Sequence, residues 1–163
     1  MNQRNVPVLA SLACALFLGG CISADQKTRP FLGMWVGKFA VSNVGVGPNT
    51  ADDQRRHTLT GYVRVLLDRK AYQMHLEGEQ QVIEIKGEWV YRGSQLILSP
   101  KKVEVKDEYE DGPNPNRKYV PSDELTKAYQ QKLTFNLNKA ANEYSAPEMK
   151  IAFLNGTHSF KKE

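Results

Sequence analysis

The stretch IEIKGEWVY, residues 83–91, decides the fold because apolar and charged side chains alternate along it. Its isoleucines, Trp89 and Tyr91 fall on one side with Gly87, whereas its glutamates and Lys86 fall on the other. A period of two is typical of a β-strand with one buried and one solvated face. The same alternation occurs in residues 35–41, 59–67, 72–76, 96–98, 103–105 and 133–137. Turn-forming residues separate these segments about every 10 to 15 residues, which predicts antiparallel strands that pair with their chain neighbours.

The number of segments predicts an all-β fold, an antiparallel up-and-down β-barrel of about eight or nine short strands. A closed barrel is favoured because it leaves no exposed strand edge, and a two-sheet β-sandwich is the alternative. One short helix is expected over residues 122–131, after Pro121 and with Ser122 as its N-cap. The apolar face of this helix consists of Leu125, Ala128 and Tyr129.

The C-terminal segment predicts a hairpin around Asn155-Gly156, since this dipeptide favours the two positive φ values of a type I′ turn. With these residues as the loop, Phe153 lies opposite His158, and Ile151 lies opposite Phe160. The apolar side chains then share one face. In a closed barrel this last strand also pairs with the first strand, near residues 35–41.

The N-terminus has the layout of a secretory signal peptide. Arg4 precedes an apolar run over residues 6–17, and Leu18-Gly19-Gly20-Cys21 follows. A run of about a dozen apolar residues is too short for a spanning helix, which needs about 20. The sequence therefore predicts a cleaved signal peptide (residues 1–20), a short tether (residues 21–30) and one β-barrel domain (residues 31–163).

The Leu18-Gly19-Gly20-Cys21 end resembles the lipobox of bacterial lipoproteins. The resemblance implies that Cys21 becomes the lipid-modified N-terminus and binds the mature chain to a membrane. Two or more acyl chains hold a protein stably on a bilayer. Ile22 stands where an aspartate tends to retain such proteins in the inner membrane. This implies the periplasmic face of the outer membrane in a Gram-negative host, and lipid anchoring to the cell membrane otherwise.

Gly33-Met34-Trp35 is similar to the Gly-x-Trp opening of lipocalins, and Gly87-Glu88-Trp89 is similar to the pattern in small lipocalin-like bacterial lipoproteins. The resemblance implies a barrel whose base is closed by Trp35, with a small apolar ligand held in the mouth. An open, apolar interior is what such a carrier needs. The alternative is that the same side chains fill the core, as in most small barrels. The candidate lining residues are Trp35, Tyr72, Met74, Trp89 and Phe135.

The composition excludes several kinds of chemistry. The chain has two cysteines: Cys14 leaves with the signal peptide, and Cys21 carries lipid on the lipoprotein interpretation. The mature domain then has no disulfide, thiol nucleophile or cysteine-ligated zinc. The formal net charge of +4 is too small and too mixed for a nucleic-acid-binding protein. The histidines, His57, His75 and His158, lie on different segments without the spacing of a metal site.

The sequence also lacks a Gly-x-Ser-x-Gly nucleophile elbow and a phosphate-binding glycine loop. The acidic run at residues 107–112 fails as a calcium loop, because Tyr109 and Lys118 occupy ligand positions. These observations predict a membrane-anchored, non-enzymatic envelope lipoprotein that presents a small β-barrel and uses no metal or cofactor. The alternatives are a carrier of a small apolar ligand and an accessory protein that binds an envelope partner.

Overall fold

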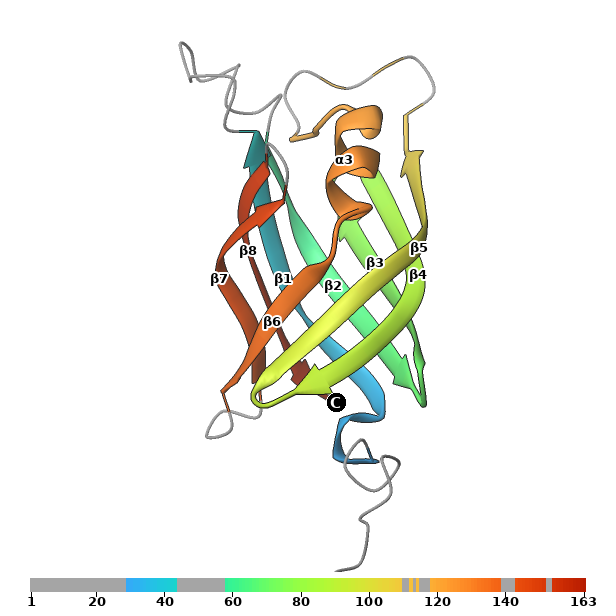
Figure 1. Cartoon of the computed structure of the whole chain (residues 1–163). Helices are drawn as coiled ribbons and strands as arrows, with labels where there is room; N and C mark the ends of the chain where they lie inside the picture. Colours follow the sequence, from blue (N-terminus) through green and yellow to red (C-terminus); the bar gives the residue numbers. More distant parts are fainter. Residues whose placement is uncertain are drawn as a thin grey trace, which may run out of the picture.

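Eight antiparallel strands form one closed barrel in sequence order (Figure 1). The structure is a computed structural model and describes residues 29–43, 58–109, 112, 114, 118–138, 143–151 and 154–163. The strands are β1 (Gly33–Asn43), β2 (Thr58–Asp68), β3 (Ala71–Gly78), β4 (Gln81–Arg92), β5 (Gln95–Asp107), β6 (Leu133–Asn138), β7 (Glu143–Ile151) and β8 (Leu154–Lys162). A 3-10 helix, η1 (Arg29–Phe31), precedes β1, and one α-helix, α3 (Ser122–Tyr129), connects β5 to β6. The predicted lipocalin-like, up-and-down barrel is confirmed, and the alternative of a two-sheet sandwich is wrong because the sheet closes on itself.

The predicted alternation sorts side chains between the barrel interior and the solvent. The alternating apolar side chains within residues 35–41, 59–67, 72–76, 83–89 and 133–137 belong to one buried core or pack against it, whereas Val36, Tyr62 and Leu66 between them are exposed. The charged residues of β4 point outward. Glu84, for example, pairs with Lys106 at 3.1 Å, and this contact lowers the pKa of the Glu84 carboxyl. Burial of one strand face therefore supplies the core.

A bulge explains why the apolar pattern of β5 changes phase. Lys86 of β4 lies opposite Lys102, but Gly87 lies opposite Pro100, so Lys101 is an extra residue on β5. One extra residue reverses which side chains face inward. Positions 96 and 98 before the bulge and positions 103 and 105 after it therefore all pack on the same core. The prediction of two separate segments at residues 96–98 and 103–105 is wrong, because both belong to β5, and the number of strands is eight.

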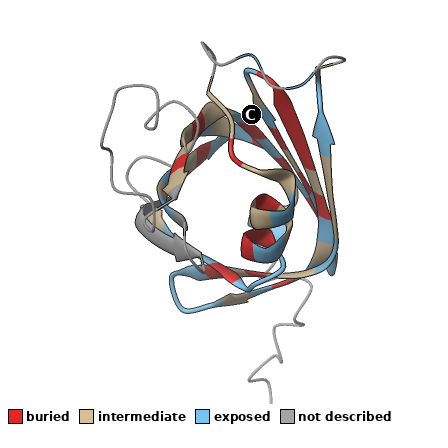
Figure 2. Cartoon of the chain, turned by 90° about the horizontal axis from the view of Figure 1, so that it is seen from above, coloured by how far each residue is buried: buried red, intermediate tan, exposed pale blue. Residues whose placement is uncertain are grey.

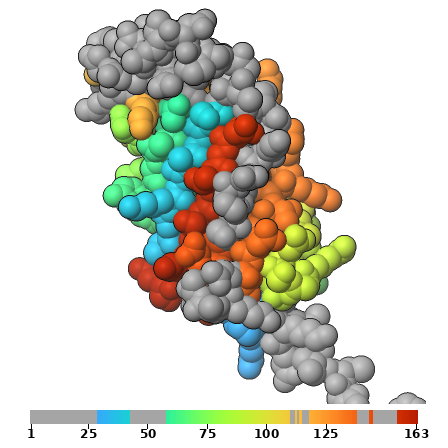
Figure 3. All heavy atoms as spheres, turned by 90° about the vertical axis from the view of Figure 1, so that its left-hand side faces the viewer, coloured from blue at the N-terminus to red at the C-terminus, as the bar shows by residue number. Residues whose placement is uncertain are grey.

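The barrel closes where β8 pairs with β1, as predicted. The register runs from Trp35 opposite Lys162 to Asn43 opposite Leu154, and Figure 3 shows the red atoms of β8 beside the blue and cyan atoms of β1. Gly37 permits this close approach, because a Cβ there would lie 1.8 Å from the carbonyl oxygen of Ser159.

The predicted C-terminal hairpin is wrong in register. Ile151 lies opposite Leu154, and Lys150 lies opposite Asn155, so Asn155 and Gly156 are paired residues of β8 and not a turn. Phe153 itself lies outside the described residues. Gly156 is a strand residue without a positive φ. Its lack of a side chain matters because a Cβ would lie 2.3 Å from the carbonyl oxygen of Ala40. Pairing with β1 therefore overrides the local turn preference of Asn155-Gly156.

Two glutamines hold the connection that leads into α3, which lies within the ring of strands at one end of the barrel (Figure 2). Gln81 is fully buried. Its Nε2 donates to Val120 O (2.7 Å), and its Oε1 accepts from Val120 N (2.9 Å). Gln80 makes the same pair of bonds with Asn114, at 3.3 Å and 2.7 Å. Main-chain groups of the connection are thus satisfied by side chains of the β3–β4 turn and β4.

Ser122 is the first residue of α3 and not its N-cap. Pro121 holds the N-cap position without a side-chain hydrogen bond. The hydroxyl of Ser122 donates to Asp107 Oδ2 at 2.7 Å instead. The helix ends at Tyr129, two residues before the predicted end. Its predicted apolar face is confirmed, since its buried residues are Leu125, Ala128 and Tyr129.

The N-terminal side of the barrel is fastened by the end of the chain. Lys162 Nζ donates to Pro30 O at 2.7 Å, and Phe31 packs against Tyr91 with ring centroids 4.2 Å apart. The predicted signal peptide, Cys21 and residues 44–57 between β1 and β2 lie outside the described residues. Among the helices that the structure describes, none is long and apolar enough to cross a membrane.

Asn155 and Gly156 distinguish the observed register from the predicted hairpin. Asn155 is an exposed strand residue, so we expect Asn155→Val to change the free energy of unfolding by at most about 0.5 kcal/mol. Gly156→Val forces a side chain against β1, so we expect this variant to lower the free energy of unfolding by about 3 kcal/mol. Urea unfolding of the full-length protein measures both. A turn at residues 155–156 disfavours valine at both positions, so comparable losses would contradict the observed register.

Candidate functional site in the barrel interior

All five predicted lining residues lie inside the barrel. Trp35, Tyr72, Met74 and Phe135 are at most 1% exposed, and Trp89 is 4% exposed. The two tryptophans also bind main chain: Trp35 Nε1 donates to Phe31 O (2.9 Å), and Trp89 Nε1 donates to Asp68 O (3.2 Å). Their polar atoms are therefore satisfied, and their rings contribute apolar walls.

A row of aromatic rings runs along β1, β6, β7 and β8. Ring centroids lie 4.9 Å apart for Trp35 and Tyr144, 5.7 Å for Tyr144 and Phe160, and 4.9 Å for Phe160 and Phe135. The ring of His158 follows at 6.2 Å from Phe135. The row thus joins two of the predicted residues, Trp35 and Phe135. The other three, Tyr72, Met74 and Trp89, belong to β3 and β4. In the described part of the chain, none of them makes a ring contact with the row.

His158 forms the polar end of this row together with Tyr129 of α3. Both side chains are buried, and Tyr129 Oη lies 2.9 Å from His158 Nε2. Burial lowers the pKa of His158 from 6.5 to about 3 and raises the pKa of Tyr129. Both groups are therefore neutral at physiological pH. A neutral imidazole has one donor and one acceptor nitrogen, so the bond to Tyr129 uses one nitrogen.

Three buried polar atoms have no hydrogen-bond partner within the described residues: Tyr72 Oη, Tyr144 Oη and His158 Nδ1. Burial raises the pKa of both tyrosines, so their hydroxyls keep their protons. An unsatisfied buried polar group costs about 1–3 kcal/mol. Such groups are uncommon in native proteins and often mark a water, ligand or functional position. The barrel interior therefore combines an apolar wall with a few unused donors and acceptors.

This arrangement suits binding better than acid–base chemistry. A histidine base in a nucleophile–base pair is usually oriented by a third group. Among the described residues, no partner for Nδ1 of His158 is recorded. His75 lies instead on the outer face, where Nε2 is 3.9 Å from a Glu77 carboxylate oxygen. His57 lies outside the described residues, and no cluster of three possible metal ligands is found in the rest.

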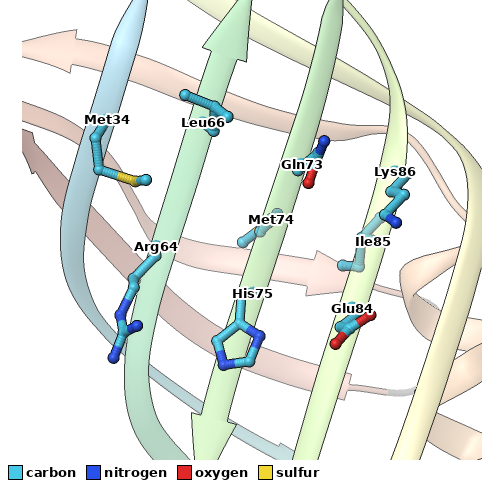
Figure 4. Close-up of a pocket in the computed structure, with 9 residues that line it drawn as sticks. All are labelled: Met34, Arg64, Leu66, Gln73, Met74, His75, Glu84, Ile85 and Lys86. Carbon is cyan, nitrogen blue, oxygen red and sulfur yellow. The ribbon is translucent and has the colours of Figure 1, made fainter.

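A hollow with a volume of about 280 Å³ lies on the outer surface of β1–β4. Figure 4 shows Met34 and Leu66 at one part of its lining, with the charged or polar side chains of Arg64, His75 and Glu84 at another. Arg64 pairs with Glu77 at 3.5 Å, outside the lining. This hollow was not predicted from the sequence, because its lining residues come from four separate strands.

Sequence reasoning missed Tyr144 and the pairing of Tyr129 with His158. Pro147 lies in β7, and the register of β7 with β8 shifts between Ala146 and Met149, so the strand lacks a regular alternation. His158 does carry a usable signal, because it alternates with Phe160 on an apolar face.

No protein-family model matches the chain, and no curated protein matches it. Among solved structures, the chain is similar to the crystal structure of Rv2717c from M. tuberculosis. The sequence identity is 17%, the match covers 86% of this chain and 98% of that chain, and the TM-score is 0.35. A likeness of this size carries no function from one protein to the other.

The low pKa of His158 makes stability depend on pH. The unfolded chain binds a proton near pH 6.5, whereas the folded chain resists protonation until about pH 3. The free energy of unfolding therefore falls as the pH decreases through this window. When the pH falls from about 7 to about 4.5, we expect the free energy of unfolding of the parent to decrease by about 2 kcal/mol more than that of His158→Gln. Urea unfolding across this range measures the difference.

His75→Gln is the matched control, because it removes a half-buried histidine from the outer face. This variant keeps the pH dependence of the parent. Parallel curves for the parent and His158→Gln would show that His158 is not held neutral by burial.

Proposed function

We propose that the protein is an exported, non-enzymatic envelope lipoprotein that presents a small β-barrel from a lipid anchor at Cys21. The observation that carries the proposal is the N-terminal order of Arg4, an apolar run and Leu18-Gly19-Gly20-Cys21. On the lipobox resemblance, Ile22 after the cysteine favours the periplasmic face of the outer membrane in a Gram-negative host. The proposal assigns no catalytic role to the barrel.

The position of η1 at the N-terminal end of the barrel agrees with such an anchor. Arg29 starts η1 at the end of the barrel opposite α3 (Figure 1). From Cys21 to Arg29 the chain advances eight residues, which span at most about 29 Å when fully extended. An anchor at Cys21 therefore keeps this end of the barrel near the membrane.

A second role, binding a small molecule inside the barrel, is supported by the three buried polar atoms without partners. A mostly apolar molecule with a few polar atoms would pack on the ring row and use these donors and acceptors. Ligand sites in proteins combine apolar walls with a small number of placed polar groups in this way. This role is compatible with the lipid anchor.

Replacing the anchor residue tests the main proposal. Radiolabelled palmitate should enter the parent protein, and Cys21→Ser should abolish both the labelling and the retention in the membrane fraction, since no acyl chain then remains. Cys14→Ser is the matched control, because it removes the other cysteine and leaves the lipobox intact. A Cys21→Ser protein that is still labelled or still membrane-bound would contradict the anchor.

Tyr144→Phe tests the second role. This variant removes one unpaired hydroxyl and keeps the ring. If no ligand uses the hydroxyl, we expect the variant to be about 1 kcal/mol more stable than the parent. If a ligand uses the hydroxyl, we expect weaker binding by about fivefold, measured by displacement of the apolar dye 1-aminoanthracene from the full-length protein. Tyr62→Phe, at an exposed position, is the control. No dye uptake together with a stabilised Tyr144→Phe variant would reject the carrier role.

A further inference from the structure

The end of the barrel at which η1 begins is basic. An up-and-down barrel places the start of β1, the β2–β3 turn, the β4–β5 turn and the end of β8 at one end, and Figure 1 shows these segments opposite α3. We call this end the base. Its basic side chains are Arg29, Arg69, Lys70, Arg92, Lys161 and Lys162, and its acidic side chains among the described residues are Asp68, Glu143 and Glu163.

The opposite end, at α3, has the reverse charge. In the described residues from 118 to 132 at this end, the basic side chains are Lys118, Lys127 and Lys132. They are outnumbered by acidic side chains of the β3–β4 turn, the end of β5 and α3, which are Glu79, Asp107, Glu108, Asp123 and Glu124. The mild net charge of the chain thus conceals a separation of charge along the barrel axis.

Most of the basic side chains at the base are not neutralised within the protein. Arg29, Arg69, Lys70 and Arg92 are exposed, and none makes an ion pair with another described residue. Lys161 pairs with Glu143 at 3.5 Å. The base therefore presents free positive charge, which an anionic surface would attract.

Arg69 is a basic residue at a backbone position that does not favour arginine. It is the first residue of the two-residue turn between β2 and β3, and its φ is +21°. Asparagine or glycine adopts positive φ more readily than arginine. The turn therefore carries a long cationic side chain at a position where local preference favours a small residue.

We propose that the base is a docking surface for anionic phospholipid headgroups, so that the barrel stands on the membrane with α3 pointing away from it. The inference rests on the proposed anchor at Cys21, because the tether brings the base to within about 29 Å of the bilayer. Basic groups near an anionic leaflet are attracted over about one Debye length, roughly 8 Å at physiological salt. Repulsion of the acidic α3 end from the same leaflet favours the same orientation.

The two cysteines allow a clean labelling experiment. On the proposed function, Cys14 is removed and Cys21 is acylated, so one introduced cysteine is the single reactive thiol. Ser94→Cys puts a fluorophore in the β4–β5 turn at the base, and Gln130→Cys puts it just after α3, both at exposed positions. Full-length lipidated protein is reconstituted into vesicles that contain a headgroup-linked quencher. The vesicles are phosphatidylcholine alone or phosphatidylcholine with phosphatidylglycerol in equal parts.

We expect the fluorophore at residue 94 to be quenched in the anionic vesicles and to lose this quenching at high salt. In the neutral vesicles we expect little quenching of the same fluorophore. The label at residue 130 shows no such contrast. Each basic residue near an anionic surface contributes about a fivefold change in the ratio of docked to undocked barrel. The triple variant Arg69→Gln, Lys70→Gln, Arg92→Gln should therefore lower that ratio about a hundredfold. Lys118→Gln, Lys127→Gln, Lys132→Gln is the matched control, because it removes the same charge from the segment around α3.

A single variant separates docking from folding. Arg69→Asn should lower the docked ratio about fivefold while the free energy of unfolding is unchanged or higher, since asparagine tolerates positive φ. Protein that floats with the vesicles but shows equal quenching with neutral lipid, or no response to the base triple variant, would overturn the docking surface alone. Protein that fails to float with either vesicle would overturn the anchor and the docking surface together.

Discussion

The pairing of β1 with β8 is the constraint on which the rest of the structure depends. It joins segments at the two ends of the domain, from Trp35 opposite Lys162 to Asn43 opposite Leu154. Without it the barrel would have two free edges and an open core. The described residues include no cysteine, so this long-range closure depends on main-chain hydrogen bonds and on buried side chains. Gly37 and Gly156, one on each strand, let the two backbones approach, because a Cβ at either position would collide with the other strand.

Closure alone does not fix the interior, because one end of the barrel is covered by α3. The helix is held before its first residue by the bonds of Gln81 to Val120. At its last residue it is held by the contact of Tyr129 with His158. Gln81 is buried with both amide atoms paired, and such directional bonds restrict a segment to one position more strongly than apolar packing does. The place of α3, and with it the polar end of the ring row, therefore follows from a few directional bonds between the helix segment and the strands.

The sequence predicts those parts of this structure that depend on local pattern. Alternation identifies the inward faces of β1 to β4 and β6, and it predicts the burial of all five candidate lining residues. Local pattern fails where pairing with a strand distant in the sequence determines the structure. Asn155-Gly156 favours a turn, but Gly156 lies in β8 because its close contact with β1 requires a glycine. Local pattern also fails at Lys101, where one extra residue reverses the parity of β5, and at Tyr144, whose strand contains Pro147. The Tyr129–His158 contact spans 29 residues and depends on how α3 is seated, which no local pattern encodes.

The even number of strands has a consequence for how the molecule meets its surroundings. Both the start of β1 and the end of β8 lie at the base, together with the β2–β3 and β4–β5 turns, which are each two residues long. The base therefore includes two short turns, whereas α3 lies at the other end. A chain anchored on its N-terminal side turns the short-turn end to its support and leaves α3 accessible. A partner or ligand would then meet α3 first, and α3 is the element that connects, through Tyr129, to the buried imidazole of His158.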